Sequence, residues 1–194
     1  MSAVPAATRA RAPALDAVVS TLAVPGLGKP SGLFVLEDGN RLVSTQQHTL
    51  QLITPSGQLA ALAGRRGESG KQDGPGAHAR FNLPAGITVD AAGQTVVADT
   101  NNHALRLVSK AGAVSTLAGG GAAGFVDGQG AAARFNKPYS VVVLPDSGEF
   151  VVSDFSNHAL RVVTPGGGVR PLAGSGQPGF ADGPGAAAAG RRRR

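Results

Sequence analysis

The chain of 194 residues has no cysteine, no tryptophan and one tyrosine. Without cysteine it has no disulfide framework, no thiolate metal site and no cysteine nucleophile. Aromatic residues make up only 4% of the chain, so the core must be built from Val, Leu, Ile and Ala. No stretch approaches the roughly 18 consecutive apolar residues of a membrane-spanning helix. These absences exclude disulfide-rich, cysteine-dependent and membrane-spanning classes of protein.

Glycine and proline are abundant, with 29 Gly and 13 Pro. Their share lies just below the range in which non-periodic Gly and Pro content indicates disorder. The hydrophobic fraction of 42% favours a folded chain instead, because so apolar a sequence has surface to bury.

The two ends of the chain carry an excess of positive charge. The formal net charge is +6, and removing Arg9, Arg11 and Arg191–Arg194 leaves 12 basic against 12 acidic residues. The body of the protein is therefore neutral, and we expect nucleic-acid contact only through the Arg191–Arg194 tail. We expect residues 188–194 to form a solvated basic tail.

The N-terminal residues 1–17 are rich in Ala, Pro and Arg, and we expect them to be a disordered leader. They contain no continuous apolar region of the kind found in secretory signals, although such a composition leaves an organelle transit segment open. Together with the absence of cysteine, this favours an intracellular protein.

An internal repeat of 54 to 55 residues organises the rest of the chain. Equivalent positions are Pro30, Pro84 and Pro138, then His48, His103 and His158, then Gly64, Gly119 and Gly174. A partial copy precedes them, since 18–26 matches 113–121. Repeats of this kind indicate an architecture assembled from stacked, similar units.

Each copy has the pattern of four short strands. In the middle copy we expect strands at 86–90, 95–99, 103–109 and 113–118, separated by turn residues. In the third of these, Leu105 and Leu107 fall on one face and Arg106 on the other. Radial stacking of such sheets gives a β-propeller. The fold class is therefore all-β, a partial propeller of about three four-stranded antiparallel blades within 18–187, at 29–82, 83–136 and 137–187.

Long inserts such as GFVDGQGAAARFNKP separate successive copies, and together these inserts contain four of the seven Phe. We expect GAAARF to form one helical turn that docks its Phe. In a four-stranded antiparallel blade the second turn and the blade-to-blade connection lie at the same end, so inserts and turns share one face, and we predict that partners bind there. The candidate partner-facing residues are Phe125, Asp127, Arg134, Phe135, Phe180 and Asp182.

The segments ADTNNHALRLV and SDFSNHALRVV resemble NHL repeats, and the resemblance covers about 29–187. It implies half of a six-bladed propeller. The motif residues are Asp99, Asn102, His103 and Arg106 in the second copy, and Asp154, Asn157, His158 and Arg161 in the third. In the first copy Ser44, Gln47 and Gln51 stand at the Asp, Asn and Arg positions by sequence spacing, and only His48 remains.

The motif is better suited to holding the fold than to binding a ligand. Asp99 and Arg106 flank a short hairpin turn and are expected to pair across it. Zinc needs nitrogens that converge to about 2.0–2.1 Å, whereas equivalent His in successive blades fan apart. The Asp-Gly steps at Asp73, Asp127 and Asp182 lack the acidic pattern of calcium loops and indicate turns. We therefore expect no metal site and no cofactor.

The resemblance implies a non-catalytic binding or scaffolding module for a protein partner. RNA binding is an alternative, which the neutral body and sparse aromatics weaken. A lactonase-like hydrolase or lyase with a metal in the central channel is a second alternative, but the expected inner strands (LFVLE, GITVD, SVVVL) are mostly hydrophobic. Three blades leave a ring open, so we expect either a fragment of a longer protein, which we favour, or two chains that complete one ring.

Overall fold

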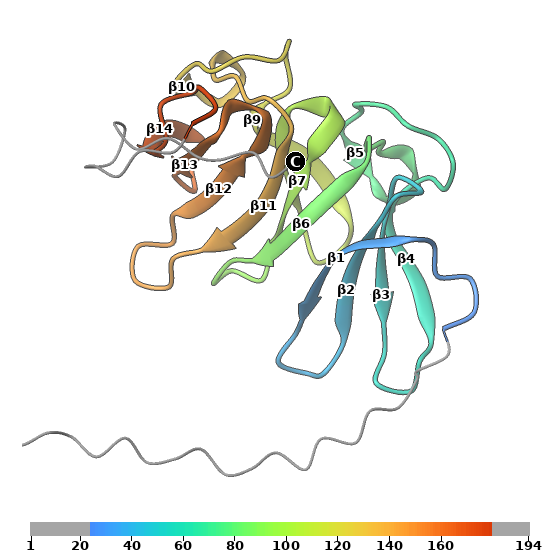
Figure 1. The fold of residues 1–194 in the computed structure, drawn as a ribbon. Coiled ribbons are helices and arrows are strands. Elements are labelled where there is room, and N and C mark those ends of the chain that lie inside the picture. Colours follow the sequence, from blue (N-terminus) through green and yellow to red (C-terminus); the bar gives the residue numbers. More distant parts are fainter. Residues whose placement is uncertain (1–23, 180–194) are drawn as a thin grey trace, which may run out of the picture.

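A computed structural model of the chain describes residues 24–179. In this range the chain forms three antiparallel sheets, which we call blades 1, 2 and 3. Figure 1 shows them side by side, with their first strands facing a common centre. This is the partial propeller that the repeat predicts.

Each blade is a four-stranded meander in which every strand pairs with its neighbour in sequence. Blade 1 comprises β1 (Pro30–Val35), β2 (Arg41–Thr45), β3 (Thr49–Ile53) and β4 (Leu59–Gly64). Blade 2 comprises β6 (Pro84–Val89), β7 (Thr95–Asp99), β8 (Ala104–Val108) and β9 (Ala113–Gly119). Blade 3 comprises β11 (Pro138–Val143), β12 (Phe150–Asp154), β13 (Ala159–Val163) and β14 (Gly168–Ala173). The four strands expected in the middle copy are confirmed.

The inserts are ordered extensions of the sheets. Short strands β5 (Gly74–Pro75) and β10 (Gly128–Gln129) pair with the outer strands β9 and β14, so each insert joins the blade that follows it. A 3-10 turn follows each, η1 (Gly76–His78) and η3 (Gly130–Ala132). The predicted helical turn is confirmed, and the sheets of blades 2 and 3 gain a fifth strand that the sequence did not predict.

Apolar side chains fill the two seams between blades. Phe81 and Phe135, one from each insert, are fully buried there. Phe81 packs with Leu42 and Leu50 in the seam between blades 1 and 2, and Phe135 packs in the other seam. A buried aromatic side chain removes about 150–250 Å² from solvent, which adds to the area that the thin aliphatic sheets bury. The insert thus supplies the core residue that the strands lack.

The inner strands approach one another at a glycine. A Cβ built on Gly86 of β6 would lie 2.7 Å from the Cα of Ser140 and 2.9 Å from the backbone nitrogen of Val141, both in β11. These distances are too short for any side chain, so glycine lets the backbones of β6 and β11 approach each other closely. Both β6 and β11 have an irregular register at this point.

The turn after the second strand of each blade is short. In blades 2 and 3 it is a 3-10 turn, η2 (Thr100–Asn102) and η4 (Phe155–Asn157), capped by a left-handed His.

No helix among residues 24–179 has the length and apolar character to cross a membrane.

Candidate functional site

A buried arginine binds the insert to the hairpin of blade 2. Arg106 is fully buried, and its Nη1 donates to Asp99 at 2.7 Å and to the carbonyl of Arg80 at 3.1 Å. Its Nη2 donates to Asp73 at 2.6 Å and to the carbonyl of Gln72 at 2.9 Å. One side chain therefore connects β7 to three insert residues, and the pairing of Asp99 with Arg106 is confirmed. We call this arrangement the clasp of blade 2.

Asp99 forms the other half of the clasp. Its carboxylate accepts hydrogen bonds from the backbone N–H of Asn82 and from Nδ2 of Asn102, each at 2.7 Å. Asn102 Nδ2 also donates to the carbonyl of Gly70 at 2.7 Å. Burial raises the pKa of Asp99, while these donors and Arg106 act in the opposite direction. Every polar neighbour belongs to the hairpin or the insert, so this carboxylate is structural.

Blade 3 repeats the clasp and adds aromatic rings. Arg161 is fully buried and donates to Asp154 at 3.1 Å and to Asp127 of the insert. Its guanidinium lies 4.6 Å from the ring centroid of Phe125 and 5.5 Å from that of Phe135. In the same way Asn157 donates to Asp154 and to the carbonyl of Gly124, both at 2.8 Å. The ion pairs and the cation–π contacts hold the second insert against its blade.

Blade 1 lacks the clasp. The strand register places Thr45, opposite Pro30, where Asp99 lies opposite Pro84, so the sequence-spacing equivalence with Ser44 was wrong by one residue. The reason is a turn one residue shorter than in the other copies. Gln47 and Gln51 each keep a buried side-chain oxygen without a hydrogen-bond partner. Both buried charges of the clasp are therefore absent from this blade.

The repeated His side chains connect neighbouring blades. His48 Nδ1 accepts a hydrogen bond from the backbone N–H of Leu83, and His103 Nδ1 accepts one from that of Lys137, each at 3.1 Å. Each His adopts a left-handed backbone conformation. Since these rings bond to different blades, they do not converge on a common point. Among residues 24–179 no cluster of three or more His, Cys, Asp or Glu residues is placed to hold a metal ion.

The predicted partner-facing residues of the insert divide into two groups. Phe135 is fully buried in the seam, so the prediction that it faces a partner is wrong, because this ring fills the gap between two sheets. Phe125 is 41% exposed, and Asp127 is exposed while paired with Arg161. Arg134 is half-buried and donates to the carbonyl of Ala131 at 2.6 Å. Phe180 and Asp182 lie outside the described residues.

Two exposed aromatic residues were missed by sequence reasoning. Tyr139 is 52% exposed, Phe155 is 64% exposed, and their ring centroids lie 6.0 Å apart. The signal was present in the repeat itself, since Ala85 and Thr100 occupy these positions in blade 2 and both are buried. Blade 3 thus has a large exposed ring at two positions where blade 2 has a small buried residue. The fold does not require a ring at either position.

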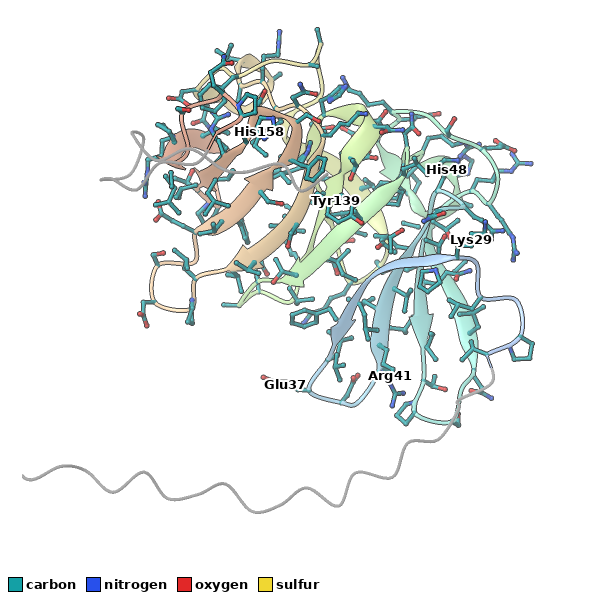
Figure 2. The ribbon with its side chains drawn as sticks, in the orientation of Figure 1. Lys29, Glu37, Arg41, His48, Tyr139 and His158 are labelled. Carbon is teal, nitrogen blue, oxygen red and sulfur yellow. The ribbon has the colours of Figure 1, made fainter. Side chains whose placement is uncertain are left out.

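We use the term insert face for the end of the blades formed by the inserts (65–83 and 119–137) and the turns after the second strands (46–48, 100–103 and 155–158). It includes Tyr139 at the start of β11, whose ring contacts Phe155 of the last of these turns. Figure 2 shows His48, His158 and Tyr139 toward this end, and Glu37 and Arg41 at the opposite end. The other end consists of hairpin turns rich in Gly, Asp and Pro.

A groove of about 400 Å³ runs along the inner strands β1, β6 and β11. Its walls carry backbone, apolar and hydroxyl groups and no charged side chain; the lining includes Ser31, Phe34, Ile87, Thr88, Tyr139 and Val142. In the described part of the chain this groove therefore presents no carboxylate or imidazole toward the channel.

Comparison with known families identifies one repeat directly, because the NHL repeat model matches residues 81–106. This stretch contains Phe81, Asp99, His103 and Arg106. Residues 81–106 are an NHL repeat. The insert Phe, the Asp99–Arg106 pair of the clasp and the His that bonds to the next blade are thus parts of the repeat.

Relatives extend the likeness beyond this one repeat. NHL repeat-containing protein 2 of Gallus gallus is 30% identical over 71% of this chain and 21% of its own length. The chloroplastic protein SUPPRESSOR OF QUENCHING 1 of Arabidopsis thaliana is 32% identical over 48% of this chain and 9% of its own length. This NHL-repeat chain therefore spans at most about a fifth of these two relatives.

A solved structure supports the fold. The auxiliary nutrient binding protein of Bacteroides ovatus superposes with a TM-score of 0.61 at 24% identity, covering 72% of this chain and 36% of that one. At this identity the similarity concerns the fold alone, an all-β arrangement that matches part of a propeller.

Proposed function

We propose that this NHL-repeat chain is a non-catalytic binding module that docks a protein partner on its insert face. The observation that carries the proposal is the position of the exposed aromatic side chains. Three of the exposed large hydrophobic residues are aromatic, Phe125, Tyr139 and Phe155, and all three lie on the insert face. Their exposed fractions are 41%, 52% and 64%.

Aromatic side chains are enriched at protein interfaces because they bury a large area at a small cost in conformational entropy. Phe125 stacks on the buried Arg161 guanidinium, and Tyr139 and Phe155 contact each other, so the three rings are held in place before any partner binds. The clasps fix the inserts that carry or flank them. A preorganised patch of this kind loses little entropy on binding.

Neither the two motif arginines nor the groove supplies the groups on which the two alternatives depend. RNA binding draws on free cationic side chains, but Arg106 and Arg161 are buried and bound to carboxylates. A metal-dependent hydrolase needs oxygen or nitrogen ligands in the channel, whereas the groove along β1, β6 and β11 is lined by uncharged residues. Both observations support the binding module over the alternatives.

Affinity capture with three matched forms of the chain tests the proposal. The forms are the wild type, a variant with Phe125, Tyr139 and Phe155 changed to Ala, and a control with Leu33 and Leu144 changed to Ala. The control removes exposed apolar side chains at 60% and 37% exposure that lie away from the insert face. We expect partner proteins to be lost from the triple variant and retained by the control.

Equal recovery of the same partners on the wild type and the triple variant would refute this use of the insert face. A salt-dependent RNA complex that survives deletion of Arg191–Arg194 would instead favour the RNA-binding alternative.

A further inference from the structure

The hydrogen bond between a His ring and the next blade occurs twice with the same geometry. His48 Nδ1 accepts from the backbone N–H of Leu83 across the first seam, and His103 Nδ1 accepts from that of Lys137 across the second, both at 3.1 Å. Because the contact occurs in two copies at the same distance, it is a regular feature of the repeat. The ring is the acceptor in both.

Unfavourable backbone conformations lie on both sides of this contact. His103 has a φ of 52°, and Lys137 has a φ of 55°. Lys137 also precedes Pro138, and a residue before proline prefers an extended backbone. Non-glycine residues adopt positive φ only when neighbouring contacts over-determine them. The hydrogen bond from the Lys137 N–H to His103 is one of the contacts that fix the backbone where the insert ends and β11 begins.

The bond requires a neutral ring. Nδ1 accepts a hydrogen bond only when the imidazole carries its proton on Nε2, and a protonated imidazolium has an N–H on both nitrogens. Protonation of His103 would therefore set two N–H donors against each other at 3.1 Å. The contact would be lost and the Lys137 N–H left without this partner.

The charged groups around His103 oppose its protonation on balance. Burial lowers the pKa of His103, the Lys137 ammonium lowers it further, and Asp154 of β12 acts in the opposite direction. The folded state thus prefers the neutral ring. The resulting stability is complete above the ordinary His pKa of about 6.5 and is lost as the pH falls below it.

We propose that His103 is an acid-sensitive latch between blades 2 and 3: its neutral ring holds the start of β11, and its protonation releases that strand. Tyr139 follows Lys137 by two residues, so release at acid pH also loosens one of the three exposed rings of the insert face. The latch itself stands on the geometry of the seam and holds whether or not a partner binds there.

Two matched substitutions test the latch in the full chain. His103→Asn keeps an oxygen acceptor near the Nδ1 position, tolerates a left-handed backbone and does not titrate. His158→Asn is the control, because His158 has a φ of 51° and its ring has no hydrogen-bond partner among residues 24–179. The two variants share any backbone effect and differ in the latch.

Thermal unfolding from pH 7.5 to pH 5.5 gives the first readout. Loss of one such bond corresponds to a decrease in Tm of about 2–4 °C in a domain of this size. All three chains keep the His48 bond, so any decrease in Tm that comes from it is common to them. We expect the wild type and His158→Asn to show a further decrease of about 2–4 °C from loss of the His103 bond, and His103→Asn to lack this part. An identical pH dependence in all three chains would overturn the latch.

NMR gives a second readout that does not depend on global unfolding. The backbone amide resonance of Lys137 is expected to shift with the same midpoint as the ring of His103, below pH 6.5. If the His103 ring titrates while the Lys137 amide resonance stays in place, the ring does not hold that amide and the proposal fails.

Discussion

Replacement of Arg106 by Gln tests whether the clasp of blade 2 is a charge pair whose members depend on each other. Blade 1 carries Gln51 at this position, so the substitution is compatible with the repeat. Asp99 is fully buried, however, and would lose its ion pair at 2.7 Å. Removing one partner of a buried pair costs about 3–5 kcal/mol, because the remaining charge is buried without compensation.

The double variant Arg106→Gln with Asp99→Thr reproduces the pair found in blade 1, where Thr45 and Gln51 stand at these positions. The double variant leaves no buried charge in the clasp of blade 2. Asp73, the second carboxylate of the clasp, is half-exposed and stays solvated. We therefore expect the double variant to be more stable than the single variant by about 1 kcal/mol or more.

Thermal unfolding followed by circular dichroism measures both variants against the wild type. For Arg106→Gln the expected loss corresponds to a decrease of about 6–20 °C in Tm. Arg170→Gln is the control, since Arg170 forms an exposed ion pair with Glu149, and such pairs contribute about 0–1 kcal/mol.

Two results would refute this reasoning. If Arg106→Gln costs no more than Arg170→Gln, the clasp does not stabilise the fold. If the double variant is as unstable as the single one, the loss arises from packing and not from an isolated carboxylate.

The remaining predictions concern residues whose roles depend on the packing of the blades. Gly119→Ala should destabilise the chain by about 2–4 kcal/mol, because φ is 76° and a Cβ would meet the His103 carbonyl and the Phe135 ring. Gly67→Ala, with a φ of 78° and nothing within 4 Å, should cost only about 1 kcal/mol, and equal losses in urea unfolding would contradict the steric argument. Phe135→Ala should cost about 3–5 kcal/mol and Phe125→Ala clearly less, because Phe135 is fully buried and Phe125 is 41% exposed; a reversed order of their unfolding midpoints would refute the assignment of Phe135 to the core.

Part of the fold follows directly from the pattern of the sequence. The period of 54 to 55 residues, the alternation around Arg106 and the turn residues predicted the number of blades and the four strands of each. These features are local, and strand length, side-chain alternation and turn chemistry are determined within a few residues. The pairing of Asp99 with Arg106 was predicted for the same reason, since the two residues flank one turn.

The contacts between copies depended on the tertiary structure. Nothing in the sequence showed that Asp73 and Asp127 of the inserts reach back to Arg106 and Arg161, or that each insert adds a strand to the next blade. The shorter turn of blade 1 also shifted the equivalence from Ser44 to Thr45, which only the strand register revealed.

Only the tertiary structure showed which aromatic residues are buried. Phe125 and Phe135 lie in one insert and look alike in the sequence, yet one ring is exposed and the other fills a seam. Whether a ring faces a second sheet or solvent is decided by the neighbouring blade, which is separated by many residues along the chain. The sequence by itself determined the repeating blade, and only the packing of one blade on the next decided which side chains hold the repeat together and which remain available to a partner.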